Sequence, residues 1–113
     1  MYPHAQWACA SVCYDDENLY VGFRSDKAAG PLVASVRQRD GNIWEDDAFE
    51  LFLNPTPKTP KDFCQFVFNS AAAIFDARHD KSDWNSKVAV KTAVADDHWT
   101  VEAAIPFSEL GLS

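Results

Sequence analysis

Apolar and polar side chains alternate along most of this chain, and the alternation is clearest in residues 48–54. Successive side chains of a β-strand point to opposite faces, so Phe49, Leu51 and Leu53 share one face and Glu50 lies on the other. The pattern therefore predicts a strand with a core face and a polar face.

The same alternation predicts further short strands before and after this one. They cover residues 7–14, 19–24, 63–69, 72–78, 87–95 and 99–105, and residues 32–36 form either a short strand or part of a loop. Polar turn residues at 15–18 and 96–98 indicate hairpins. Residues 106–111 predict a short helical turn that Gly111 ends. The prediction is an all-β protein, an antiparallel, jelly-roll-like β-sandwich of about seven strands.

Length and charge narrow the classes of protein. The chain has 113 residues, which predicts one domain over residues 1–113, and its formal net charge is −7. An acidic chain of this kind is a poor partner for nucleic acid or an anionic membrane surface, because both attract clustered Lys and Arg. A neutral ligand remains compatible. The sequence contains neither an apolar run near the ~20 residues of a membrane helix nor a signal-peptide pattern, and it leaves the compartment undecided.

The three cysteines leave at least one thiol unpaired. Cys9 and Cys13 lie on one face of the same predicted strand, ~13 Å apart at ~3.3 Å per residue, which is too far for a disulfide between them. We expect Cys9, Cys13 and Cys64 to be buried free thiols.

A candidate binding surface lies around Trp44. It precedes the strand that carries Glu50, and Gln65 and Asn69 share the polar face of the next predicted strand. A flat indole beside carboxylate and amide groups suits a sugar, because the C–H face of the sugar ring packs on the indole while its hydroxyls take polar partners. The plainer alternative is a buried tryptophan at the start of a core strand.

Four fragments then occur in a recognisable order. They are YDDENLYV at 14–21, RDGNIWEDD leading into FELFL at 39–53, QF followed by Asn69 at 65–69, and WTVE leading into AIPF at 99–107. Together they resemble the family 9 carbohydrate-binding modules and their DOMON-like relatives, over about residues 8–111. The resemblance implies a β-sandwich module of the kind often attached to secreted polysaccharide-degrading enzymes. In sugar-binding members, two tryptophans clamp the terminal sugar.

The matching motifs imply roles for individual residues. Trp44 matches the first clamp tryptophan, Glu50 an acidic partner of the sugar, and Asn69 an amide partner; Gln65 shares the face of Asn69. Trp84 lies in a polar loop, where it either replaces the second clamp tryptophan or caps the edge of the core. The predicted function is non-catalytic recognition of a neutral carbohydrate by tryptophan stacking and polar contacts.

The chain also departs from the family pattern. Val67 stands where sugar-binding members have an arginine. Family members normally continue past the Ile-Pro-Phe turn, where the second clamp tryptophan lies, and begin with an earlier strand. The chain thus resembles the middle portion of the family domain. Missing strands would expose sheet edges, so a homo-oligomer is expected. The alternative function is a structural or dimerisation protein that has lost the sugar site.

Catalysis and redox chemistry find less support in the sequence. Asp46, Asp47 and Glu50 lie close in the chain, but no alternation places two carboxylates across a cleft as a glycosidase needs, so no catalytic residue is expected. Haem binding, known from DOMON-like relatives, is a further alternative. Haem would need an axial His or Met, but Met1 is the only methionine and no His falls on a predicted strand face.

The histidines and a cluster of acidic residues are the candidate metal ligands. His4, His79 and His98 are scattered and lack ligand spacing, so no transition-metal site is expected. The acidic residues 15–18 are either a calcium-type oxygen cluster, since the family often has structural calcium, or a plain hairpin turn. No other cofactor is expected.

Overall fold

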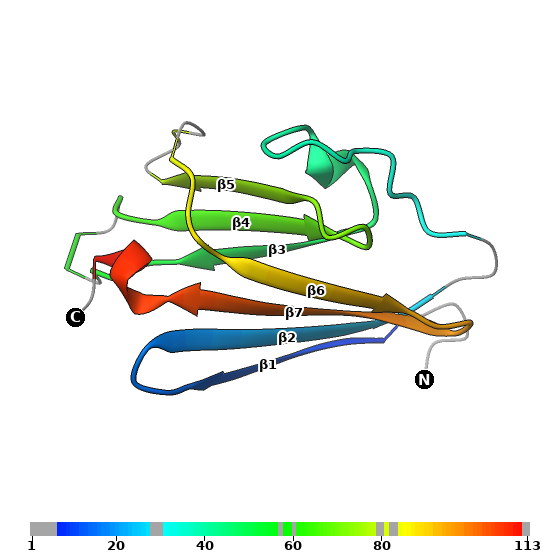
Figure 1. Cartoon of the computed structure of the whole chain (residues 1–113), viewed down its shortest axis with the longest axis horizontal. Helices are drawn as coiled ribbons and strands as arrows, with labels where there is room; N and C mark the ends of the chain where they lie inside the picture. The colour runs from blue at the N-terminus through cyan, green and yellow to red at the C-terminus, as the bar shows by residue number, and fades with distance from the viewer. Residues whose placement is uncertain are drawn as a thin grey trace.

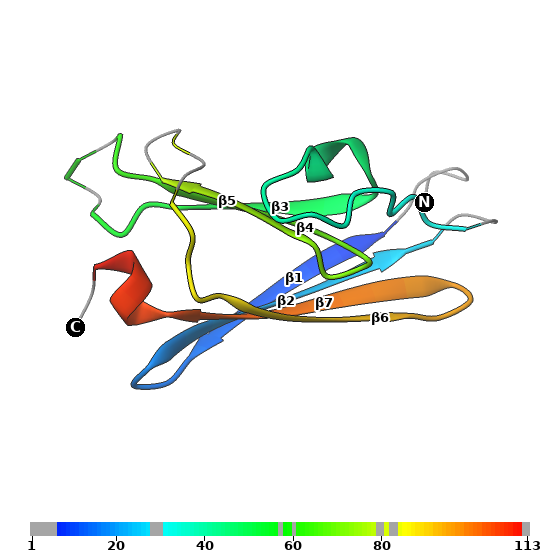
Figure 2. The same ribbon diagram turned by 45° about the horizontal axis from the view of Figure 1, so that its top comes forward.

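Seven strands form two antiparallel sheets that pack face to face (Figures 1 and 2). The structure is a computed structural model, which describes residues 7–27, 31–56, 58–59, 61–78, 81 and 84–111. The four-stranded sheet has the order β1 (Ala8–Tyr14), β2 (Asn18–Asp26), β7 (His98–Pro106), β6 (Ala89–Val94). The three-stranded sheet has the order β3 (Ala48–Leu53), β4 (Cys64–Asn69), β5 (Ile74–Arg78). The predicted all-β antiparallel sandwich is confirmed.

Sequence-adjacent strands pair as hairpins, as the turn residues predicted, and one long-range pairing joins the two ends of the chain. β2 pairs with β7 along its whole length, from Asn18 opposite Pro106 to Asp26 opposite His98. β2 is longer than its alternation predicted, and residues 32–36 form a loop rather than a strand.

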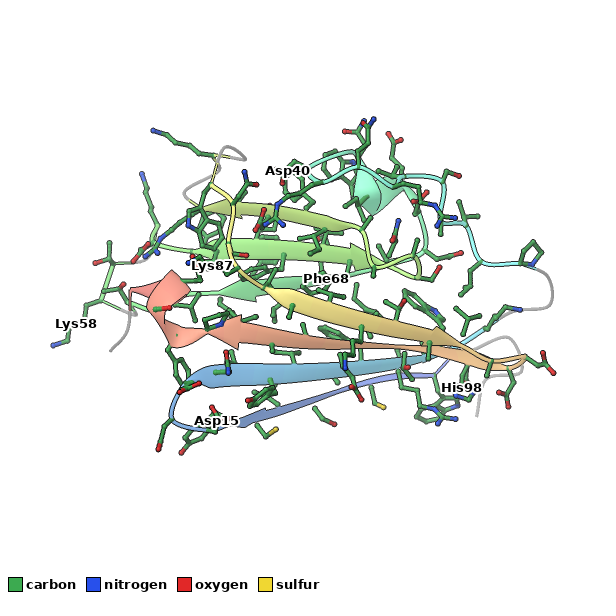
Figure 3. The ribbon with its side chains drawn as sticks, in the orientation of Figure 1. Asp15, Asp40, Lys58, Phe68, Lys87 and His98 are labelled. Atoms are coloured by element: carbon green, nitrogen blue, oxygen red, sulfur yellow. The ribbon has the colours of Figure 1, made fainter. Side chains whose placement is uncertain are left out.

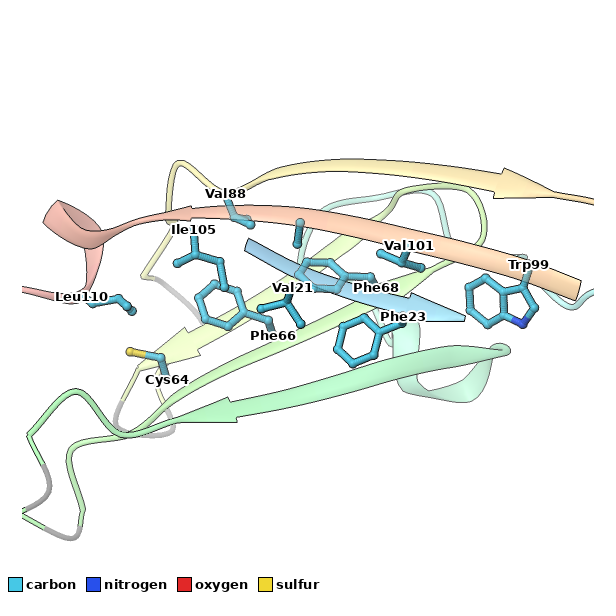
Figure 4. Close-up of a cluster of buried hydrophobic side chains, with 11 residues drawn as sticks. Val21, Phe23, Cys64, Phe66, Phe68, Val88, Trp99, Val101, Ile105 and Leu110 are labelled. Atoms are coloured by element: carbon cyan, nitrogen blue, oxygen red, sulfur yellow. The ribbon is translucent and has the colours of Figure 1, made fainter. Parts of the chain in front are cut away.

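The core lies between the sheets, where the predicted apolar faces meet. Phe49 of β3 stacks on Phe23 of β2, with ring centroids 4.4 Å apart, and its ring centroid is 4.8 Å from that of Trp99. Phe66 and Phe68 of β4 are fully buried in the same cluster. Figure 4 shows Phe23, Phe66, Phe68 and Trp99 directed into the space between the sheets. β3 therefore lies above β2, and the core face predicted for β3, with Phe49, Leu51 and Leu53, is confirmed.

β1 extends beyond the three-stranded sheet. All seven of its residues are exposed, including Val12 and Tyr14, which lie in register with the buried side of β2. No described strand of the other sheet covers β1. The expectation of buried thiols is therefore wrong for Cys9 and Cys13, which are exposed, and correct for Cys64. Burial raises the pKa of the Cys64 thiol.

Two short 3-10 turns are the helical elements of the described residues, η1 (Ile43–Glu45) and η2 (Phe107–Leu110). η2 ends at Gly111, whose φ of 75° is the left-handed conformation that glycine adopts without strain, as the sequence predicted. Among the described residues, no helix is long and apolar enough to cross a membrane.

Candidate functional site

The candidate site lies on the outer face of the three-stranded sheet, the side turned away from the core. Register fixes which side chains share this face: Glu50 lies opposite Val67, and Val67 lies opposite Phe75. Beside this row, Phe52 of β3 lies opposite Gln65 of β4. Acidic, amide and aromatic side chains therefore meet on one sheet face.

A loop of residues 31–47 folds across one end of this face. Figure 2 shows its helical turn η1 on the side of β3, β4 and β5 that faces away from the other sheet. Ile43 of η1 is fully buried in a small cluster with Val67 and Ala73, and Val36 and Phe75 pack against it. The loop is thus held by its own apolar contacts, separate from the main core.

Trp44 follows directly after the buried Ile43 and keeps 48% of its surface exposed. Its ring meets Phe75 nearly at right angles (87°), with centroids 5.1 Å apart. Trp44 therefore packs against Phe75 and remains accessible to solvent. The alternative of a buried tryptophan is wrong for Trp44, because Ile43 takes the buried position.

Glu50 and Gln65 share the outer face with Trp44. Glu50 is exposed and Gln65 half-buried, on neighbouring strands and in adjacent rows of the register. Phe52, which is exposed and contacts Phe63 at a centroid distance of 6.0 Å, adds a second ring beside Gln65. The sequence did not single out Phe52 as a site residue, although it alternates in phase with Glu50.

Asn69 has a different role from the one predicted. It is fully buried, and its Nδ2 donates to the Val36 carbonyl at 2.7 Å and to Asp46 Oδ2 at 3.1 Å. Its Oδ1 accepts from the backbone N–H groups of Ala71 and Ala73, both at 3.0 Å. Because these bonds use both ends of the amide, Asn69 holds the loop in place and does not present its amide to a ligand.

Two acidic residues beside Trp44 anchor the same loop from the other side. Asp46 Oδ2 accepts from the Val36 N–H at 2.9 Å, and Asp47 Oδ2 accepts from the Val33 N–H at 2.7 Å. The Val36 N–H, with help from Asn69, lowers the pKa of Asp46. Backbone donors therefore engage both carboxylates and tie them to the loop.

The buried carboxylate of Asp76 in β5 binds the loop through Arg39. Asp76 Oδ2 accepts from Arg39 at 2.6 Å and from the Ser86 N–H and hydroxyl at 2.8 and 2.7 Å. The side chain of neighbouring Asp40 accepts from the Asp76 N–H at 3.1 Å. Burial, together with the charge of Asp76, raises the pKa of Asp40. Residues 39–40 of the loop and Ser86 therefore both bond to Asp76 of β5.

Trp84 lies on the inner side of the three-stranded sheet. Its ring meets Phe66 edge-on at a centroid distance of 5.8 Å, within the main core cluster. Phe66 points into the sandwich and Trp44 sits outside it, so Trp84 does not lie across a ligand from Trp44. Of the two alternatives for Trp84, the cap on the edge of the core describes its position.

A polar hollow of about 520 Å³ lies in the loop next to η1. Its lining residues carry hydroxyl, guanidinium, amide and carboxylate groups, and they are Ser35, Val36, Arg37, Gln38, Gly41, Asn42 and Glu45. A Cβ on Gly41 would come within 2.6 Å of Val36 Cγ1, so only glycine fits at this turn without a shift of Val36. Two of the lining residues, Asn42 and Glu45, lie before and after Trp44 in the sequence and contribute hydrogen-bonding groups to the hollow.

In the acidic turn between β1 and β2, the Asp15 carboxylate accepts hydrogen bonds from nearby residues (Figure 3). Asp15 Oδ1 accepts from the N–H groups of Glu17 and Asn18, both at 2.8 Å, and Oδ2 accepts from the Tyr20 hydroxyl at 2.6 Å. The Tyr20 hydroxyl is the main reason that the pKa of Asp15 is lowered. These bonds support the interpretation of residues 15–18 as a hairpin turn. In the described part of the chain, no three His, Cys, Asp or Glu side chains are grouped as metal ligands.

One histidine lies at the start of a strand, where the sequence predicted a turn. His98 begins β7 rather than lying in the turn before it, and its Nδ1 is 2.6 Å from Asp97 Oδ1 (Figure 3). Met1, His4 and His79 lie outside the described residues. His98 is thus engaged by a carboxylate at the exposed end of a hairpin.

The architecture is that of a β-sandwich module with an exposed ring on one sheet face. A family model described as "Carbohydrate family 9 binding domain-like" matches residues 4–113. The chain belongs to this family, as its sequence motifs suggested.

A solved structure shares the fold. It is a carbohydrate-binding module family 9 domain from Caldicellulosiruptor kristjanssonii in complex with glucose, with a TM-score of 0.64 and 21% sequence identity. The alignment covers 93% of this chain and 52% of that structure, so the chain spans about half the length of the relative. No curated protein matches the chain.

Proposed function

We propose that the chain is a non-catalytic module that binds a neutral carbohydrate on the outer face of the three-stranded sheet. The observation that carries the proposal is Trp44, which packs against Phe75 and leaves 48% of its surface open beside polar side chains. Membership of a carbohydrate-binding family supports the ligand class, and the glucose complex of the structural relative gives a first probe.

Trp44 supplies the stacking surface in this proposal. The C–H face of a sugar ring packs on the indole, and Phe75 limits the orientations that the indole samples, so less rotamer entropy is lost on binding. Glu50 and Gln65 supply acceptor and donor groups on the neighbouring strands. The net charge of −7 repels anionic ligands, so the proposed sugar is uncharged.

Isothermal titration with glucose and with neutral oligosaccharides tests the proposal. Replacing Trp44 with Ala should weaken binding by about 2 kcal/mol, or ~30-fold, since a central aromatic platform is typical of binding hot spots. Trp7→Ala is the matched control, because Trp7 is 64% exposed but lies at the start of the other sheet. Unchanged affinity in Trp44→Ala, or equal losses in both variants, would contradict the site.

A second function is favoured by two specific observations. Trp84 is used in the core, and Val67 is fully buried beneath the loop, so the outer face offers one exposed tryptophan and no strand-borne arginine between Gln65 and Asn69. A module that has lost its sugar site and acts through protein contacts fits this arrangement. A folded protein that binds none of the sugars tested would favour this function.

A further inference from the structure

β1 is an outer strand of its sheet, and among the described residues no strand pairs with the side of β1 that faces away from β2. The Asp26 N–H donates to the Trp7 carbonyl at 2.8 Å, and the Asp15 N–H donates to the Asn18 carbonyl at 3.1 Å, so odd-numbered residues of this strand face β2. The even-numbered residues direct their backbone N–H and carbonyl groups toward the open side; these are Ala8, Ala10, Val12 and Tyr14.

This edge lacks the usual protection against pairing. Outer strands are commonly guarded by charged side chains or proline, but β1 has the sequence ACASVCY, with neither. The outer strand at the opposite edge, β6, carries Lys91 near its centre. The side of β1 that faces the three-stranded sheet is also uncovered, with Val12 63% and Tyr14 78% exposed. β1 thus has both open backbone groups and exposed apolar side chains.

The two thiols of β1 lie at equal distances in sequence from the centre of the strand. Ser11 is the central residue of the strand, and Cys9 and Cys13 lie two positions before and after it on the same face. When two antiparallel copies of β1 pair along their full length, Ser11 lies opposite Ser11 of the second copy. Cys9 then lies opposite Cys13 of the second copy, and the reverse pair follows by symmetry.

We propose that two copies of this chain pair through β1, around a two-fold axis at Ser11, into one continuous eight-stranded sheet. Because the even-numbered residues make the new ladder bonds, Cys9 and Cys13 fall at non-hydrogen-bonded pairs. Opposed Cα atoms at such pairs are about 4.5 Å apart, within the range that a disulfide spans. The two exposed thiols of one copy therefore lie within bonding reach of those of the other.

β3, an edge strand of the three-stranded sheet, does not accept a second copy in the same way. β3 lies above β2, as the stacked rings of Phe49 and Phe23 show, and β1 projects beyond it. A second β3 paired antiparallel with the first would lie above β1, and its own β2 would occupy the same space as β1. Pairing through β1 instead leaves the space of two strands between the two copies of β3, so no strands collide.

Cysteine cross-linking tests both the pairing and its register. Oxidised glutathione accepts the two electrons and two protons that each pair of thiols releases, and becomes two thiols itself. The wild-type chain should form a covalent dimer, whereas Cys9→Ser and Cys13→Ser should each remain uncross-linked alone. An equal mixture of the two variants, distinguished by a mass tag, should give a dimer with one copy of each. Cross-linking of either variant with itself, or no mixed dimer, would overturn the register.

A measurement without oxidation tests the dimer itself. Light scattering of the reduced protein at micromolar concentration should give twice the 12.6 kDa of one chain. Ser11→Glu places two like charges directly opposite each other and should weaken the dimer about fivefold. Ala93→Glu is the control, since Ala93 is exposed on the same outer face but on β6. A monomer in the wild type, or an equal effect of both variants, would overturn the proposal.

The dimer does not rest on the sugar site, because β1 lies in the four-stranded sheet whereas Trp44 of η1 packs on the outer face of the three-stranded sheet. A chain that binds sugar as a monomer and a dimer that binds none are therefore distinguishable results.

Discussion

Asn69 holds the Val36 carbonyl at 2.7 Å, and through this bond a fully buried strand residue positions the loop that carries Trp44. The same amide bonds Asp46 and the two N–H groups of the turn after β4. Asn69 is therefore a positioning residue for the outer face, although it lies out of reach of a ligand.

Asn69→Ala should remove about 3 kcal/mol from the free energy of unfolding, because it leaves several buried backbone groups without their partner. Sugar affinity should fall with it as the loop loosens. Gln65→Ala is the comparison: it should cost less than about 1 kcal/mol of stability but weaken binding ~5-fold. Chemical denaturation and calorimetric titration of both variants measure this. An Asn69→Ala protein of wild-type stability would show that the amide network contributes nothing.

Trp84→Ala should destabilise the fold by about 2–3 kcal/mol, since the ring packs on Phe66 in the main core. Sugar affinity of the folded variant should stay within about twofold of wild type. Thermal unfolding followed by titration well below the midpoint separates the two effects. A large loss of affinity with unchanged stability would instead place Trp84 against the ligand.

Asp76→Ala should cost about 3 kcal/mol of stability, because Arg39 and the two Ser86 donors lose their buried acceptor. The control is Asp97→Ala, which removes a pairing with His98 in which the carboxylate is exposed to solvent, so stability should stay close to that of the wild type. Urea unfolding curves of both proteins provide the measurement. Equal midpoints for the two variants would contradict the role of Asp76.

Acid should release the loop around Trp44. The pKa of Asp46 is lowered from its ordinary value of 3.8, so its contribution to stability is complete above that value and is lost as pH falls through the lower folded pKa. Arg37 also favours the charged form of Asp46. Asp40 acts in the opposite sense: its pKa is raised, so its protonation as pH falls favours the folded chain.

Unfolding measured from pH 5 to pH 2 should therefore show a loss of stability below 3.8 that is smaller in Asp46→Asn than in wild type. Asp15 and Asp97 also have lowered pKa values and titrate in the same range, so the difference between the two proteins isolates Asp46. Parallel curves for the two proteins would argue against the contribution of Asp46.

The alternation of side chains was sufficient to predict the strands and their core faces, because burial on one side of a sheet selects every second residue. Phe49, Phe66 and Phe68 lie where that pattern placed them. Alternation does not say which strand ends up without a covering layer. Cys9 and Cys13 were expected to be buried because the prediction could not show that β1 projects beyond the other sheet.

The positions of the exposed residues of the candidate site were predictable, whereas the contacts of its buried residues were not. Trp44, Glu50 and Gln65 share the outer face, as motif and alternation indicated. The role of Asn69 depends on a loop more than 20 residues earlier in the chain folding over it, since Val36 is 33 positions away. No local pattern encodes such a contact, and the same holds for Arg39 and Asp76.

β1 lies in the four-stranded sheet, and Trp44 of η1 packs on the outer face of the three-stranded sheet. Because of this separation, the proposed dimer keeps two candidate binding faces, one from each copy. A two-fold axis perpendicular to the four-stranded sheet leaves the outer faces of both three-stranded sheets on the same side. Once one face has engaged a polysaccharide surface, the second binds at a high effective concentration, and avidity gains of about 10²–10⁴ follow without any new contact. A module arranged in this way would favour repeating, immobilised glycans over free sugars, even if each face alone binds weakly.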